Sequence, residues 1–101
     1  MKHLDLDLTE RAQAYMREYL SMYEPESMFA LSYGPTRWRF IVVTKAQAGE
    51  IEATSGITGE TVYITNDGAT LLLPERSDVV RLSGKTLDVV NDVFTTNERA
   101  S

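Results

Sequence analysis

The segment from residue 28 to residue 44 constrains the fold of this chain more than any other. Two apolar runs rich in β-forming residues flank a Gly-Pro pair, and this arrangement predicts a β-hairpin. A four-residue loop, 34–37, puts the bulky side chains of both runs on one face, whereas a three-residue loop would separate them onto opposite faces. We therefore predict the four-residue loop, which pairs Tyr33 with Trp38, Leu31 with Phe40 and Phe29 with Val42. The rest of the chain should pack against this apolar face.

Length and composition predict one globular domain, 1–101, in which residues 97–101 fray. A hydrophobic fraction of 43% is ordinary for a folded protein and argues against disorder. No apolar run approaches the ~20 residues of a membrane-spanning helix, so we expect no membrane association. The first ten residues carry three acids and lack the apolar segment of a secretory signal, which favours a cytoplasmic location.

The residues that the chain lacks exclude several kinds of chemistry. There is no cysteine, which rules out disulfides, zinc–thiolate sites, thiol nucleophiles and cysteine-ligated clusters. The only histidine, His3, stands close to the N-terminus, so the chain has almost no residues from which to build a Ser-His-Asp triad or a multi-histidine metal site. Gly84-Lys85-Thr86 imitates the end of a phosphate-binding loop, but Val79 occupies the position of an essential glycine. We expect no catalytic residue, no cofactor and no enzymatic activity.

Periodicity indicates the remaining elements. Strict alternation over residues 4–8 predicts a strand with its leucines inward. Apolar residues at i, i+3, i+4 and i+7 predict an amphipathic helix over about 10–22, capped by Thr9. After the hairpin we expect a polar connection at 45–49 and strands at 50–54 and 60–65. We then expect a short helix at 68–73, an exposed loop at 75–78, and strands at 79–82, 85–90 and 93–96.

Arg37 and Arg39 are the most distinctive binding candidates. If Trp38 faces the core, both arginines share the opposite face of the strand with Ile41 and Val43. Two guanidinium groups beside aliphatic side chains can grip a carboxylate or phosphate bidentately, and arginine is enriched in protein interfaces. The alternative is a solvated strand face on which the arginines pair with acids nearby in sequence, namely Glu50, Glu52 or Glu60.

Two further functional hypotheses rest on charged residues. Asp5 and Asp7 share the wet face of the first strand, where they form either a carboxylate pair for a hard metal ion or a solvated edge. The second hypothesis is therefore a carboxylate-ligated metal-binding protein or enzyme. The third is a nucleic-acid regulator that acts through Arg37 and Arg39, although a net charge of −5 argues against general nucleic-acid affinity.

Three stretches of the second half follow a familiar order. They are Glu60-Thr61-Val62-Tyr63-Ile64-Thr65-Asn66-Asp67-Gly68, Leu82-Ser83-Gly84-Lys85-Thr86-Leu87-Asp88-Val89-Val90 and Phe94-Thr95-Thr96-Asn97. With the opening Leu6-Asp7-Leu8-Thr9-Glu10-Arg11-Ala12, they resemble the A-type iron–sulfur carrier family, the HesB/IscA-like proteins. That family runs strand, acidic turn, short helix and a Gly-x-x-Leu-Asp-aromatic-Val strand, and it closes with Phe-x-x-Asn-Pro. The resemblance implies a compact α+β domain, in which a twisted β pseudobarrel or mixed sheets pack against one N-terminal amphipathic helix, plus a short second helix.

The departures from the family pattern determine what the resemblance implies for function. Gly34-Pro35-Thr36-Arg37 stands where the family has a Gly-Cys-Ser-Gly turn, and Glu98-Arg99-Ala100-Ser101 replaces its Cys-Gly-Cys tail. All three cysteine ligands are missing, so we expect no iron–sulfur cluster and no metal. In this respect the chain resembles a cysteine-free branch of the family, the DsrR type, and the resemblance implies an accessory role in the dissimilatory sulfite reductase system of sulfur oxidation.

The first hypothesis follows from the resemblance to the family together with the loss of its cysteine ligands. It is a non-catalytic accessory or regulatory protein that binds another macromolecule, with another protein as the expected partner. The partner-binding surface would be the hairpin turn, where the cluster site of the family would lie. Its residues are Gly34, Pro35, Thr36, Arg37 and Arg39.

Overall fold

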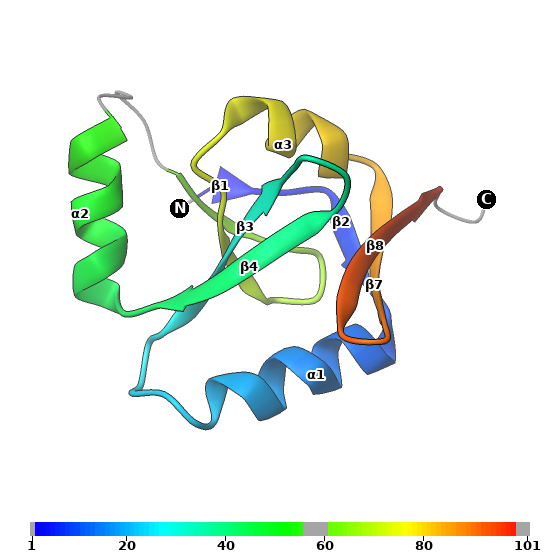
Figure 1. The fold of residues 1–101 in the computed structure, drawn as a ribbon, viewed down its shortest axis with the longest axis horizontal. Coiled ribbons are helices and arrows are strands. Elements are labelled where there is room, and N and C mark those ends of the chain that lie inside the picture. Colours follow the sequence, from blue (N-terminus) through cyan, green and yellow to red (C-terminus); the bar gives the residue numbers. More distant parts are fainter. Residues whose placement is uncertain (1, 56–60, 99–101) are drawn as a thin grey trace.

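The predicted hairpin is present and organises the larger of two sheets. The computed structural model describes residues 2–55 and 61–98, with residues 52–55 described by their backbone alone. β3 (Met28–Tyr33) and β4 (Trp38–Val43) pair antiparallel through a four-residue loop (Figure 1). Tyr33 lies opposite Trp38, Leu31 opposite Phe40 and Phe29 opposite Val42. The register predicted from the apolar pattern is therefore confirmed.

Within the described residues, the strands form two mixed sheets. The larger has the order β1-β5-β6-β3-β4 and includes β1 (Lys2–His3), β5 (Val62–Ile64) and β6 (Thr70–Leu72). The smaller has the order β2-β7-β8 and consists of β2 (Leu6–Leu8), β7 (Lys85–Val90) and β8 (Val93–Glu98). Parallel and antiparallel pairs occur in both sheets, and neither sheet closes into a barrel. The α+β class with mixed sheets is confirmed.

The leucines near the N-terminus connect the two sheets. The chain leaves the larger sheet after β1 and enters the smaller one at β2, so the strand predicted over 4–8 is present only as β2. Leu4, Leu6 and Leu8 are nonetheless all buried, as their alternation predicts. Thr9 then caps α1 (Glu10–Leu20), because its hydroxyl oxygen accepts a hydrogen bond from the backbone N–H of Ala12 at 3.2 Å.

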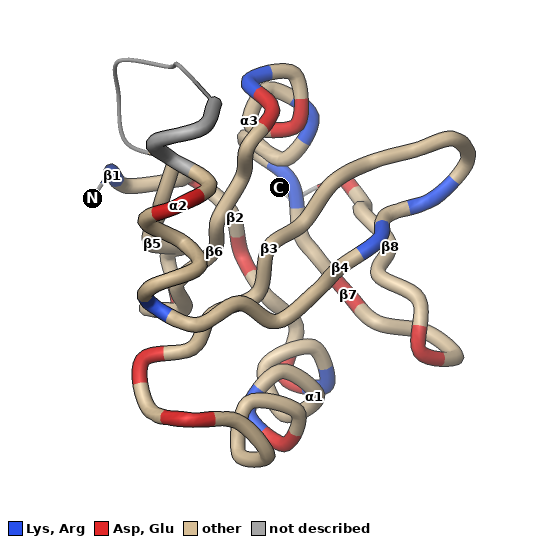
Figure 2. Tube along the Cα trace, turned by 60° about the vertical axis from the view of Figure 1, so that its left-hand side comes forward, with Lys and Arg blue, Asp and Glu red and all other residues tan. Residues whose placement is uncertain are grey.

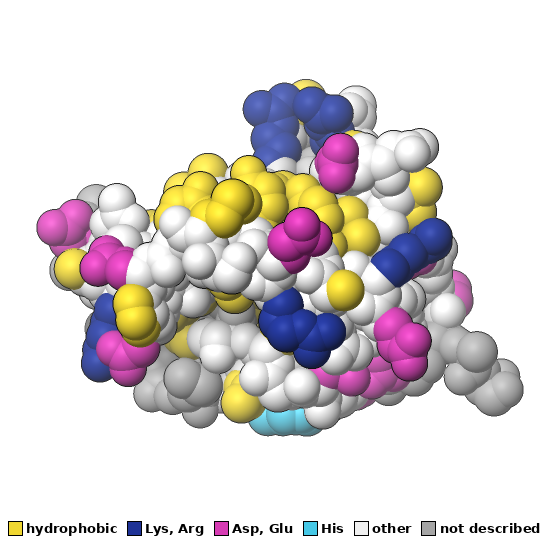
Figure 3. Space-filling model, turned by 90° about the horizontal axis from the view of Figure 1, so that it is seen from below, with side chains coloured by type: hydrophobic (Ala, Val, Ile, Leu, Met, Phe, Trp, Pro, Cys, Tyr) yellow, Lys and Arg dark blue, Asp and Glu magenta, His cyan; other side chains and the backbone are white. Residues whose placement is uncertain are grey.

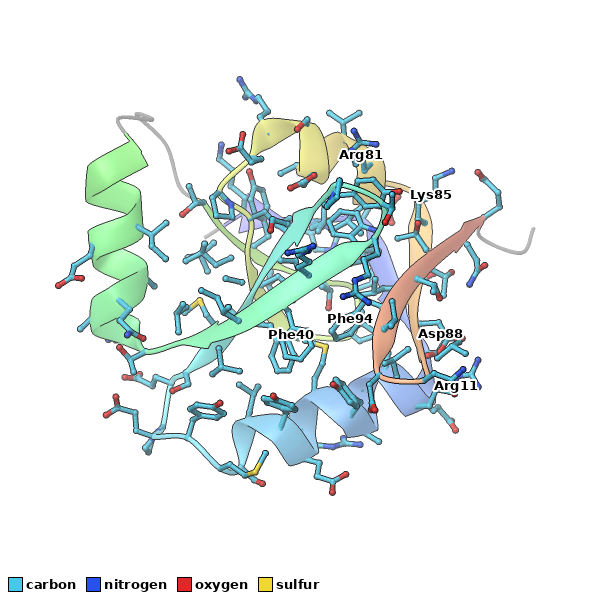
Figure 4. The ribbon with its side chains drawn as sticks, viewed as in Figure 1. Arg11, Phe40, Arg81, Lys85, Asp88 and Phe94 are labelled. Atoms are coloured by element: carbon cyan, nitrogen blue, oxygen red, sulfur yellow. The ribbon has the colours of Figure 1, made fainter. Side chains whose placement is uncertain are left out.

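The core lies between the inner face of the hairpin, α1 and β8. Phe29 and Phe40 stack at 4.8 Å between ring centroids, and Phe94 of β8 meets both rings edge-on (Figure 4). Tyr15 and Tyr19 of α1 close the cluster from the other side with edge-on contacts to Phe40. These tilted and edge-on arrangements are the ones that aromatic quadrupoles favour. The aromatic stripe of α1 is therefore core packing, with the tyrosines only half-buried.

The first error of the sequence reading concerns residues 45–55. The predicted polar connection at 45–49 and strand at 50–54 are wrong, because one helix, α2 (Lys45–Ser55), occupies this segment. Thr44 and Gln47 form a reciprocal capping box: the Gln47 side chain accepts from the Thr44 N–H at 2.9 Å, and the Thr44 hydroxyl accepts from the Gln47 N–H at 3.2 Å. The segment is also rich in helix-forming residues. Ala48 and Ile51 of α2 pack on the outer face of the larger sheet.

The second error concerns residues 68–82. The predicted helix at 68–73 is strand β6, and the predicted loop at 75–78 and strand at 79–82 are one helix, α3 (Arg76–Leu82). Gly68, with φ of 82°, makes the tight turn that returns the chain from β5 to β6. Leu71 and Leu73 face the main core, while Leu72 faces α2, so this leucine run is covered on both sides. A run buried on both faces lacks the alternation that marks a strand.

The C-terminal hairpin matches its prediction more closely. β7 covers the strand predicted at 85–90, and β8 begins at Val93 as predicted but extends to Glu98. Asn97 and Glu98 therefore belong to a strand, whereas the rest of the segment predicted to fray, 99–101, lies outside the described residues. None of the helices in the described part of the chain is long and apolar enough to cross a membrane.

A buried carboxylate joins α1 to the smaller sheet. Asp88 of β7 accepts hydrogen bonds from Arg11 at 2.6 and 2.7 Å, from the Thr9 hydroxyl at 2.6 Å and from the Val89 N–H at 2.8 Å. These donors, Arg11 foremost and then Thr9, hold the pKa of Asp88 well below its usual range. The start of α1 is thus fixed to β7 by charge-assisted hydrogen bonds, as Figure 4 shows for Arg11 and Asp88.

Replacing Asp88 should destabilise the fold. We expect Asp88→Ala to lower the free energy of unfolding by roughly 1.5–3 kcal/mol, because hydrogen bonds to a charged group are lost and Arg11 loses its partner. Because the folded-state pKa of Asp88 is depressed, this contribution is complete above the unfolded pKa of about 3.9 and declines as the pH falls through the folded value. Urea unfolding between pH 7 and pH 2 measures both effects. The control is Glu18→Ala, which removes an exposed acid of α1. An equal loss of unfolding free energy in both variants would contradict this role of Asp88.

Candidate protein-binding surface

The loop between β3 and β4 is a tight turn held by its own backbone. The Gly34 N–H donates to the carbonyl of Arg37 at 2.9 Å, and the Tyr33 hydroxyl donates to the carbonyl of Thr36 at 3.4 Å. Gly34 has φ of 146°, a backbone conformation that residues other than glycine rarely adopt, and its peptide bond to Pro35 is cis. Gly34 therefore supplies a backbone conformation that the turn requires.

Helix α3 supports this loop from behind. Asp78 is 3% exposed, and its carboxylate accepts a hydrogen bond from the Tyr33 N–H at 3.3 Å. Arg81, one turn along α3, lies 3.6 Å from the same carboxylate and stacks over the Tyr33 ring at 4.8 Å from its centroid. Tyr33 in turn packs edge-on against Trp38 at 5.2 Å. The loop is thereby tied both to α3 and to the core.

Of the two predicted arginines, Arg39 lies on the outer face of β4 and Arg37 is the last residue of the loop. Trp38 is buried, so Arg39 points to the opposite side of the strand together with Ile41, which is 61% exposed, and Arg37 is exposed as well. Val43, the next residue on this face, is buried under α2. The outer face is therefore covered at the α2 end and open at the loop end, and Figure 2 shows basic residues along this open end of β4.

An apolar groove of about 280 Å³ runs beside the open part of this face. Its floor is formed by β3 and β4, and its sides include Ile51 of α2 and Pro74, which precedes α3. Arg39 and Ile41 also line it, so a guanidinium group stands at the edge of an apolar depression. The full lining consists of Ala30, Leu31, Ser32, Arg39, Phe40, Ile41, Ile51 and Pro74.

The two arginines lack acidic partners within the described part of the chain. No ion pair or side-chain hydrogen bond joins Arg37 or Arg39 to another described residue. Of the acids that were alternative partners, Glu60 and the side chain of Glu52 lie outside the described residues. The charged, exposed guanidinium groups of Arg37 and Arg39 can therefore donate hydrogen bonds to a carboxylate or phosphate of another molecule.

The other candidate sites are less well formed. The amide group of Asn66 donates to Asp5 at 3.0 Å and to Asp7 at 2.9 Å, so each carboxylate already accepts a hydrogen bond. No group of three or more His, Asp or Glu side chains is arranged to hold a metal ion among the residues that the structure describes. Gly84 precedes strand β7 rather than a helix, so it lacks the helix N-terminus that a phosphate-binding loop requires.

The sequence predicted the outward position of Arg39 on β4, but it did not predict the residues around the arginines. Asp78 and Arg81 were assigned to a loop and a strand, whereas both belong to α3 and support Tyr33. Ile51 was assigned to a strand and lies instead on α2, at the side of the groove. The i, i+3 spacing of Asp78 and Arg81 is a helical signal, but seven residues give too few turns for periodicity to be recognised.

A scan against models of known protein families and a search of curated proteins both find no match to this chain.

The support of the loop by α3 can be tested by substitution at Asp78. We expect Asp78→Ala to cost roughly 1–3 kcal/mol of unfolding free energy, because the Tyr33 N–H and Arg81 lose their shared partner. Amide hydrogen exchange at Tyr33 and Gly34 should also accelerate more than exchange in β7. Glu75→Ala is the matched control, since the Glu75 side chain makes no capping hydrogen bond to α3. Unchanged exchange at the loop in Asp78→Ala would refute this role.

Proposed function

We propose that this protein is a non-catalytic binding module that recognises an acidic segment of another protein on the outer face of β4. The observation that carries the proposal is the pair of exposed residues Arg37 and Arg39, which have no acidic partner among the described residues and precede the exposed Ile41 on the same hairpin. Carboxylates of the partner would pair with the guanidinium groups. The cationic face stands out on a chain whose net charge is −5, so it favours acidic partners.

The groove beside the arginines supports recognition of a protein rather than a free anion. Its lining is largely apolar, and it lies directly next to Arg39. An acidic segment that also presents one apolar side chain would fill the groove while its carboxylates reach the arginines. Interfaces typically combine such a desolvated apolar anchor with charged contacts around it.

The order of the elements also supports descent from the A-type iron–sulfur carrier pattern. β5, an acidic turn at Asn66 and Asp67, helix α3 and the strand β7 with Leu87-Asp88 follow one another as in that family, with β6 as an addition. Of the two segments that correspond to the cysteine ligands of the family, the structure describes the loop 34–37 and Glu98. The loop contacts α3 through Tyr33, and Lys85, which follows α3, pairs with Glu98 at the end of β8.

On this basis, the partner-binding surface would occupy the place of a lost cluster site. The corresponding biological role is accessory or regulatory, as in the DsrR type of bacterial sulfur oxidation. Such a role requires a surface that recognises one partner and requires no reactive group. The absence of cysteine from the whole sequence fits this reading.

The binding surface can be tested with a defined peptide. We expect acetyl-Glu-Leu-Glu-Leu-amide to cause saturable NMR shifts at Arg39, Ile41 and Ile51, and the isosteric Gln-Leu-Gln-Leu peptide to bind more weakly. Arg37→Gln/Arg39→Gln should weaken binding about fivefold or more, because two charge-assisted contacts are lost. Lys2→Gln/Arg17→Gln removes the same charge from other exposed positions and should leave binding unchanged. Equal binding of both peptides, or an equal effect of both double variants, would refute the proposal.

A second prediction concerns the cluster itself. Purified protein incubated anaerobically with ferrous iron and sulfide, then desalted, should show no visible absorption, because the chain offers no thiolate to hold a cluster. A carrier protein with its cysteines, treated in parallel, is the positive control. A stoichiometric visible chromophore bound to this protein would overturn the reading of a lost cluster site.

A further inference from the structure

A notch of about 250 Å³ lies between α1 and the turn that joins β7 to β8. It is lined by Tyr15, Glu18, Tyr19 and Met22 of the α1 side and by Asp92 of the turn. Its volume is below the roughly 300 Å³ at which pockets for drug-sized ligands begin, so it suits a single side chain. Figure 3, which looks onto the underside that α1 forms in Figure 1, shows hydrophobic side chains gathered on this face with acidic ones among them.

The chemistry of the notch is that of a cation site. Tyr15 and Tyr19 are half-buried, so part of each side chain is exposed; their ring centroids lie 5.7 Å apart, and Tyr23 stacks on Tyr19 at 6.1 Å. Met22, which is 69% exposed, adds a flexible and polarisable side chain at the rim. Aromatic faces attract ammonium and guanidinium groups through their quadrupoles.

Two carboxylates frame these rings. Neither Glu18 nor Asp92 forms a side-chain hydrogen bond or ion pair with a residue in the described part of the chain. Burial, and after it the negative charge of Asp92, raises the pKa of Tyr15, which places that charge close to the phenol. Neutral rings between two unpaired negative charges disfavour anions and favour a cation that is also flat and apolar in part.

A further observation concerns the backbone conformation of the turn between β7 and β8. Asn91 and Asp92 have φ of 51° and 64°, and Val90 pairs with Val93, so the two residues form the loop of a type I′ hairpin. Glycine is the favoured residue at the second position of such a loop. An aspartate there is less favourable for the backbone, and its carboxylate stands at the notch.

We propose that the notch formed by Tyr15, Tyr19, Met22, Glu18 and Asp92 binds an arginine side chain presented by a partner protein. A guanidinium group stacks on aromatic rings and donates bidentate hydrogen bonds to carboxylates, whereas an ammonium group does only part of this. Charge complementarity with the two unpaired acids selects a basic segment as the occupant. This surface is distinct from the arginine face of β4 and carries the opposite charge, so the proposal goes beyond the acidic-partner function and does not depend on it.

The test is an NMR titration with acetyl-Gly-Arg-Gly-amide, followed at the Tyr15 and Tyr19 rings and the Met22 methyl group. We expect saturable shifts at these groups, and much smaller ones with the citrulline peptide, which has the same shape without the charge. Glu18→Gln/Asp92→Asn should weaken arginine binding about fivefold or more while keeping the shape of the notch. The matched control Glu24→Gln/Glu75→Gln removes two exposed acids elsewhere and should leave binding unchanged.

Asp92→Gly separates binding from folding. Glycine suits the φ of 64°, so this variant should have a raised melting temperature and yet a weakened affinity for the arginine peptide. A merely structural role of Asp92 would not lower affinity while stability rises. Arg37→Gln/Arg39→Gln should bind the arginine peptide like the unaltered protein, which keeps this test independent of the other surface.

Three outcomes would overturn the proposal. The first is equal binding of the arginine and citrulline peptides, and the second is unchanged binding in Glu18→Gln/Asp92→Asn. The third is a shift of the notch signals with protein concentration alone that matches an increase in mass by sedimentation. That result would assign the notch to a second copy of this chain instead of a partner protein.

Discussion

The structure depends on the burial of the inner face of the β3–β4 hairpin. Phe29, Leu31 and Trp38 are almost completely buried there, and Phe40 joins them in contact with the aromatic residues of α1 and β8. Each large side chain withdrawn from water contributes roughly 1.5–3 kcal/mol, so this face outweighs any single polar contact in the molecule. The four-residue loop fixes the register that makes such burial possible. A slip by one residue would turn Arg39 and Ile41 inward and expose the aromatic residues.

The same constraint explains which parts of the fold were predictable from the sequence. Where one face of an element is buried and the other is wet, the apolar pattern repeats with the period of the backbone, as in β4 and α1. The apolar pattern does not identify an element when both of its faces are buried or when few of its side chains are buried. Leu71, Leu72 and Leu73 are buried on both faces of β6, and their uninterrupted run fits a helix or a strand equally well. Of the α2 side chains that the structure describes, Ala48 is buried and Ile51 is partly buried, so the helical signal of this segment is the capping box of Thr44 with Gln47.

The residues of the candidate site also fall into two groups: those that a local sequence pattern predicts and those that only the tertiary packing brings together. Strand alternation was enough to place Arg39 on the outer face of β4, opposite Trp38, with the exposed Arg37 before it at the end of the loop. The residues that give this face its shape come from distant parts of the chain: Asp78 and Arg81 support the loop from α3, and Ile51 lines the groove from α2. Their positions follow from how the helices pack on the sheet, and no local pattern encodes that packing.

The two proposed surfaces share the aromatic core as their common support. Phe40 contacts both surfaces: it lines the groove, and its ring packs edge-on against Tyr15 and Tyr19, which line the acidic notch. Its strand neighbours Arg39 and Ile41 face outward and line the groove beside the arginines. A closely packed core of this kind holds its surface groups in fixed relative positions. On an acidic chain without cysteine, surfaces of fixed shape and opposite charge are a physical basis for selecting partners.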